Sequence, residues 1–152
     1  MKNVLHISLA SFATLIFSST NSFAKSTDQC VHDLDKLSCV QYVSNYDGDS
    51  FVFEVLNVHP LFGSKFKIDF SEYEAPKIRS KQKCQKLLGK KSKDFAKDNL
   101  KSAKKIDLVN VTKTRSGKFK GDVLVDGKSL SEIMLKNKLL IKAGSKDFKW
   151  CK

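Results

Sequence analysis

Alternation of apolar and polar residues predicts β-strands in the first half of the chain. Residues 39–43 and 50–56 are rich in β-branched and aromatic side chains and flank a turn at 46–48, which predicts a hairpin. Residues 65–70 alternate strictly, so we predict a third, half-buried strand. Its inward side chains are expected to be Phe66, Ile68 and Phe70.

Helical spacing follows in the second half. Apolar and small residues recur every three or four positions from about 87 to 102, which predicts an amphipathic helix with lysines on its outer face. Residues 106–111 and 120–125 predict two more strands. Ser129 and Glu132 form a capping box that opens a short helix to about residue 137. Its inward face should carry Leu130, Ile133 and Met134.

The order of these elements is three strands, a helix, two strands and a helix. This order is typical of a five-stranded OB-fold barrel with about two helices packed against it. We therefore predict an α+β fold that is mainly β.

The first 24 residues have the three-part pattern of a secretory signal peptide. A basic start precedes an apolar stretch at 4–17, and small residues at 22 and 24 mark a cleavage site before Lys25. The apolar stretch is too short to span a bilayer comfortably. We expect an N-terminal arm at 25–38 and one domain at 39–152. The mature chain should be a monomer, periplasmic or secreted, without stable membrane insertion.

Four cysteines would remain after cleavage, namely Cys30, Cys39, Cys84 and Cys151. An even count in an oxidising compartment indicates two disulfides, and three pairings are possible. Cys30 and Cys39 are close in sequence, which favours the pairs Cys30–Cys39 and Cys84–Cys151. A zinc site is the competing interpretation, but the sequence has no Cys-x-x-Cys pair to support it.

Positive charge is concentrated in one segment. The formal net charge is +12, and residues 77–105 hold 12 Lys and Arg against Asp94 and Asp98, a local excess of +10. Such a segment attracts polyanions and gains affinity by releasing counterions from phosphates. The alternative is a lysine-rich face that only keeps the protein soluble. The residues expected to bind nucleic acid or another polyanion are Lys90, Lys91, Lys93 and Lys97.

Two acidic clusters lie at predicted strand ends, Asp47-Gly48-Asp49-Ser50 and Tyr73-Glu74-Ala75-Pro76-Lys77. Clusters of this kind collect oxygen ligands for a hard cation such as calcium. Together with residues 121–128 and the terminal Trp150-Cys151, they resemble the staphylococcal-nuclease-like (thermonuclease) family, in its exported Gram-negative branch. The resemblance covers residues 40–151 and implies the barrel of that family.

The resemblance also implies roles for single residues. The family hydrolyses phosphodiesters with one calcium ion, a glutamate that helps to activate water, and two arginines that bind the phosphate. By position, Asp49 and Glu74 would be the metal ligands. The first arginine, the glutamate and the second arginine are replaced by Asp69, Lys77 and Lys118, or by Lys120 at the last position if a short gap is allowed.

These replacements predict weak or lost nuclease activity, because a reversed charge repels phosphate and a lysine cannot act as a carboxylate base. The leading hypothesis is an exported protein that binds nucleic acid or another polyanion. The enzyme alternative is an active calcium-dependent nuclease in which Glu72 or Glu74 replaces the missing carboxylate and Lys118 or Lys120 the arginine. A structural or protein-binding module whose acidic residues bind no metal is the third.

Overall fold

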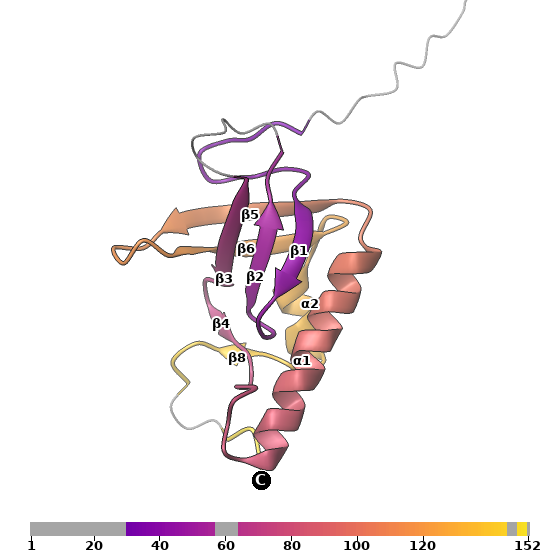
Figure 1. Cartoon of the computed structure of the whole chain (residues 1–152), viewed down its shortest axis with the longest axis vertical. Helices are drawn as coiled ribbons and strands as arrows, with labels where there is room; N and C mark the ends of the chain where they lie inside the picture. Colours follow the sequence, from indigo (N-terminus) through magenta and orange to yellow (C-terminus); the bar gives the residue numbers. More distant parts are fainter. Residues whose placement is uncertain (1–29, 57–63, 146–148, 152) are drawn as a thin grey trace, which may run out of the picture.

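The computed structural model describes residues 30–56, 64–145 and 149–151, so the predicted signal peptide lies outside the described residues. The predicted α+β class, mainly β, is confirmed (Figure 1). The elements in chain order are β1 (Gln41–Asn45), β2 (Ser50–Glu54), β3 (Lys65–Phe70), β4 (Tyr73–Glu74), α1 (Lys83–Ser102), β5 (Ile106–Lys113), β6 (Phe119–Val125), β7 (Lys128–Ser129), α2 (Leu130–Lys136) and β8 (Ile141–Lys142).

The main sheet follows the order β1-β2-β3-β6-β5, with β7 added to β6. Neighbouring strands are antiparallel except β3 and β6, which run parallel. The strand ladder is not closed among the described residues. Across the seam, the Val40 amide donates a hydrogen bond to the Ile106 carbonyl at 2.9 Å, and Leu37 bridges to Leu108. The arrangement is OB-like, with a seam held by the segment before β1.

The core lies between the curved sheet and the two helices. Its largest fully buried side chains include Phe51, Phe53 and Ile68 from the sheet and Leu130 and Met134 from α2. The predicted inward face of β3 is confirmed for Ile68 and Phe70, whereas Phe66 is partly buried and packs edge-on against Phe119. Burial of these alternating side chains fixes which face of each strand turns outward.

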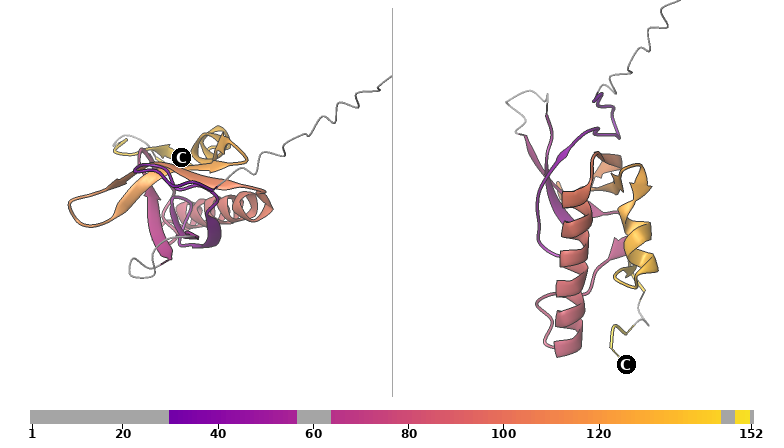
Figure 2. Two further views of the ribbon diagram at one scale, coloured as in Figure 1. Left: turned by 90° about the horizontal axis from the view of Figure 1, so that it is seen from above. Right: turned by 90° about the vertical axis from the view of Figure 1, so that its right-hand side faces the viewer.

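Helix α1 begins four residues before the predicted start. Its first turns are exposed and lack the apolar spacing of the later turns, so the sequence pattern did not reveal them. It runs beside α2 along the sheet (Figure 2). Three of the four buried residues of the helix are small, which allows a close approach. The four are Gly89, Ser92, Ala96 and Leu100.

Three short strands escaped prediction, namely β4, β7 and β8. β4 and β8 pair antiparallel, with Glu74 opposite Ile141, and form a separate two-stranded sheet. Two residues carry too little alternation to be recognised as a strand. The pairing holds the acidic segment after β3 against the chain that follows α2. The capping box at the start of α2 is confirmed, since the Ser129 hydroxyl accepts from the Glu132 amide.

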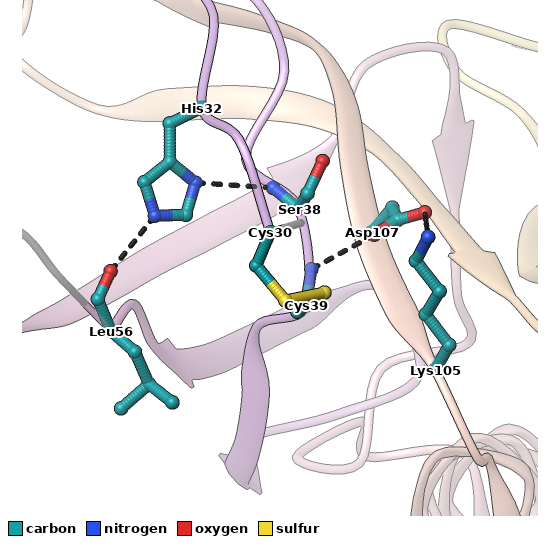
Figure 3. The surroundings of a disulfide bond; sticks show 7 residues. All are labelled: Cys30, His32, Ser38, Cys39, Leu56, Lys105 and Asp107. Carbon is teal, nitrogen blue, oxygen red and sulfur yellow. Dashed lines mark hydrogen bonds and ion pairs between the residues drawn. A yellow bond between two sulfur atoms is a disulfide. The ribbon is translucent and has the colours of Figure 1, made fainter. Parts of the chain in front are cut away.

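Both predicted disulfides are present, Cys30–Cys39 and Cys84–Cys151. Figure 3 shows the first, which lies where the N-terminal arm meets β1. Next to it, one ring nitrogen of His32 contacts the Leu56 carbonyl at 2.8 Å and the other accepts from the Ser38 amide. The Cys39 amide donates to Asp107, which also pairs with Lys105. The described part of the arm is therefore attached to both β2 and β5.

Candidate functional site

The turn between β1 and β2 is fixed to helix α1. The buried Asn45 side chain donates from Nδ2 to the carbonyls of Asp47 and Lys93, at 2.7 and 3.0 Å, and its Oδ1 accepts from the Tyr42 hydroxyl. Gly48 lies so close to α1 that a Cβ atom there would collide with the Ser92 side chain. The acidic residues of this turn are therefore held in place by buried hydrogen bonds and close packing.

An acidic pocket of about 310 Å³ opens at the end of this turn. Its walls come from the β1–β2 turn, from β3 and β4, and from β6. Four carboxylates and two lysines line it, namely Asp47, Asp49, Asp69, Glu74, Lys67 and Lys120. The sheet register explains part of this grouping, because Asp69 lies opposite Ser50 on β2 and opposite Lys120 on β6.

The surroundings of Asp49 favour the protonated form of its carboxyl group. Burial raises its pKa from an ordinary value of 3.8 to about 7, helped by a hydrogen bond in which protonated Asp49 donates to Asp47 and by the charges of Asp47 and Asp69. The Ala75 amide acts in the opposite direction. The Asp49 amide also donates to Asp47 Oδ1 at 3.4 Å, so one oxygen of Asp47 already has a partner within the turn.

Asp69 also has a partner within the sheet. The Ser50 hydroxyl donates to its Oδ1 at 2.6 Å, across the β2–β3 pair. This carboxylate therefore sits in the pocket as a satisfied acceptor. It places a negative charge where the resemblance implies a phosphate-binding arginine.

The predicted site residues divide into those inside the pocket and those outside it. Asp49 and Glu74, the predicted metal ligands, both line it, and so does Lys120. Lys118 is exposed in the β5–β6 turn, where its backbone pairs with Thr114. The Glu72 carbonyl accepts from the Ala143 amide, and neither Glu72 nor Lys118 lines the pocket.

A calcium ion would find suitable oxygen chemistry here but not a finished ligand set. Among the described residues, no group of three or more His, Cys, Asp or Glu side chains converges to hold a metal ion. Burial and the neighbouring carboxylates raise the pKa of Asp49, which favours its protonated form over a metal-binding carboxylate. Calcium prefers six to eight oxygen ligands, so these side chains alone do not form a complete site for the ion.

A larger, basic groove adjoins the acidic pocket. It has a volume of about 1080 Å³ and shares Asp47, Ser50 and Lys67 with the pocket. Its basic residues come from β3, from the segment between β4 and α1, and from α1 itself, against two acids, Asp47 and Asp94. They are Lys67, Lys77, Arg79, Lys90 and Lys93.

Half of the predicted binding lysines lie in this groove. Lys90 and Lys93 line it, whereas Lys91 and Lys97 are outside its lining. Sequence reasoning missed Lys67 and Arg79 as groove residues. Strict alternation along β3 does place Lys67 on its outward face, and Arg79 belongs to the segment with the charge excess. What the sequence did not show is that these two face the same groove as α1.

Comparison with known proteins agrees with this architecture. No protein among the curated sequences matches the chain. A family profile described as staphylococcal nuclease homologue matches residues 67–144. The match runs from β3 to the residues after β8 and includes Asp69, Glu74, Lys77 and Lys120, while Asp47 and Asp49 precede it. As it covers just over half of the chain, the protein belongs to the staphylococcal nuclease homologue family.

Proposed function

We propose that this protein binds nucleic acid, or a polyanion of similar charge density, in the basic groove, and that its nuclease activity is weak or absent. The observation that carries the proposal is the groove itself. Five cationic side chains from three separate segments line one depression, with two acids among the described residues of its walls. Membership in a nuclease family supports a phosphodiester as the ligand.

Electrostatics explains how such a groove would bind. Each lysine or arginine that neutralises a phosphate releases a condensed counterion, which makes affinity steeply dependent on salt. The groove is also rigid on one side, because Asn45 fixes the β1–β2 turn to the Lys93 carbonyl of α1. A fixed array of charges loses less conformational entropy on binding than free surface lysines do.

The proposal that cleavage is weak rests on two positions. Asp69 puts a carboxylate, bonded to Ser50, where the family's first arginine would contact phosphate. Lys77 replaces the family's glutamate and lines the basic groove, so this position contributes positive charge for binding and no base for water activation. Loss of two coupled catalytic groups typically lowers rates by several orders of magnitude.

The protein would act outside the cytoplasm, as a domain of the exported Gram-negative branch of its family. Residues 1–24 have the pattern of a signal peptide, which leaves an arm at 25–38 and the domain at 39–152. Two disulfides agree with an oxidising compartment. In the described part of the chain, no helix combines the length and the apolar character needed to cross a bilayer.

Binding of a fluorescent 12-nucleotide oligothymidylate to the mature protein, followed by anisotropy over a salt series, tests the proposal. Two variants of equal charge share the same helix, K90Q/K93Q inside the groove and K91Q/K97Q outside it. The groove variant should bind more weakly and should flatten the log–log salt dependence by about 0.7 for each phosphate that is no longer neutralised. The outer variant should bind much as wild type does.

Equal losses of affinity in the two variants would indicate binding by lysines spread over the surface and not by the groove. A wild-type protein that does not bind the oligonucleotide would contradict the proposal altogether. The same samples, incubated in calcium and in chelator, report cleavage. Robust cleavage in calcium that stops in chelator would favour the alternative, a nuclease that uses Asp49, Glu74 and Lys120 of the acidic pocket.

A further inference from the structure

We infer that Tyr46 stacks against one unpaired base of the bound strand, so that the groove selects single-stranded nucleic acid. The inference rests on the proposed function and names a contact within the same groove. Tyr46 lines the groove beside Lys67, Lys90 and Lys93. It is 63% exposed although it is a large aromatic residue.

The position of Tyr46 is fixed by its neighbours. Its amide donates to the Ser50 carbonyl at 3.0 Å, which closes the β1–β2 turn. On either side, Asn45 is bonded to the Lys93 carbonyl, and Gly48 packs against Ser92 of α1. The backbone that carries Tyr46 is thus held at two points, and its exposed ring can receive a ligand with little loss of backbone freedom.

The charge around the ring suits a base with a phosphate on each side. The Lys67 ammonium lies over the ring, 4.7 Å from its centroid, which is a cation–π contact. A nucleobase would take the opposite face, and the neighbouring phosphates would meet Lys67 on one side and Lys90 and Lys93 on the other. In a duplex both faces of each internal base are stacked, so this contact is open only to an unpaired base.

Three proteins test the inference, namely wild type, Tyr46→Ala and Tyr46→Phe, each with 12-nucleotide oligothymidylate and with inorganic polyphosphate of the same charge. Removing the ring should weaken oligothymidylate binding roughly 5- to 150-fold, the range for losing one stacked base. Polyphosphate binding should change less than about twofold, because no base is present. Phenylalanine should restore oligothymidylate binding. Leu135→Ala, which removes an exposed apolar side chain from α2, should change neither.

The outcomes distinguish stacking by Tyr46 from binding of the polyanion in the basic groove. If Tyr46→Ala binds oligothymidylate as wild type does, or loses polyphosphate equally, stacking is wrong while groove binding stands. Failure of the phenylalanine variant to restore binding also contradicts stacking. If wild type binds neither probe, both proposals fail together. Thermal unfolding of Tyr46→Ala at the wild-type temperature would show that the exposed substitution leaves the fold intact.

Discussion

At the scale of single residues, the site combines two neighbouring carboxyl groups with a turn that is held against α1. Asp47 and Asp49 lie close together because Gly48 between them packs against α1, and burial together with the neighbouring Asp47 raises the pKa of Asp49. Lys67 and Lys120 line the same pocket as these acids.

Asp49 should make the stability of the protein depend on pH. Its pKa of about 7 in the fold exceeds the ordinary 3.8, so the folded state holds a proton that the unfolded state releases. This contribution to stability is complete below pH 3.8 and is lost as the pH rises to about 7. The other charged groups of the pocket are Asp47, Asp69, Glu74, Lys67 and Lys120.

In Asp49→Asn the loss over this range should disappear, a difference on the order of 4 kcal/mol in the free energy of unfolding. Urea unfolding in chelator between pH 4 and 8 measures it. Asp94→Asn, which removes an exposed carboxylate from α1, is the control and should follow wild type. Parallel curves for wild type and Asp49→Asn would show that Asp49 is not protonated in the fold.

Placing the family's arginine and glutamate at the proposed catalytic positions should raise cleavage of single-stranded DNA. Asp69→Arg/Lys77→Glu/Lys120→Arg restores a bidentate phosphate contact, a carboxylate and a second guanidinium in or beside the pocket. We expect a rate at least about tenfold above wild type, and much less from single reversions, since groups acting as a unit are not additive.

The matched control carries Lys118→Arg in place of Lys120→Arg, because Lys118 lies outside the pocket and Lys120 inside it. Gel assays in calcium and in chelator compare the two triple variants. Higher activity with Lys118→Arg would reverse the assignment drawn from the pocket lining.

At the scale of elements, sequence periodicity predicted the long strands and both helices but not how they meet. Alternation along β3 and the helical spacing of α1 follow from burial of one face, which is a local pattern. The start of α1 and the β4–β8 pair were missed because their residues carry no such pattern. The groove depends on contacts between segments far apart in the chain, so lysines could be counted from sequence but not divided between its inside and outside.

The contact between α1 and the segment before it should be sensitive to one methyl group. A Cβ on Gly89 would come within 2.9 Å of the Ile78 amide nitrogen and would also meet the Pro76 carbonyl. Gly89→Ala gains about 1 kcal/mol of helix propensity, but overpacking against backbone typically costs ~1–3 kcal/mol. We expect a net loss of stability and weaker groove binding, as Lys77 and Arg79 flank this contact.

Thermal unfolding and oligothymidylate anisotropy measure the two effects. Lys91→Ala introduces alanine on an exposed face of the same helix and should not lower the unfolding temperature. A Gly89→Ala protein as stable as wild type would mean that the close approach of helix and segment can relax without cost.

At the scale of the whole molecule, the disulfides act over very different lengths of chain. Cys84–Cys151 joins residues 67 positions apart, from the first turn of α1 to the C-terminal segment, whereas Cys30–Cys39 spans 9. A longer closed loop restricts the unfolded chain more, so Cys84→Ala/Cys151→Ala should lose more stability, roughly 3–5 kcal/mol, than Cys30→Ala/Cys39→Ala. Urea unfolding of the two double variants tests the order, which the reverse ranking would refute.

The parallel pairing of β3 with β6 also has a consequence for the order of folding. Residues 68–70 find their partners only at 119–121, so β3 has an open edge until the chain has emerged well past α1. An unpaired edge beside aromatic strands invites pairing between chains. Fragments that end before residue 119 should therefore aggregate, and the first half of the barrel depends on the second for its solubility as well as for its shape.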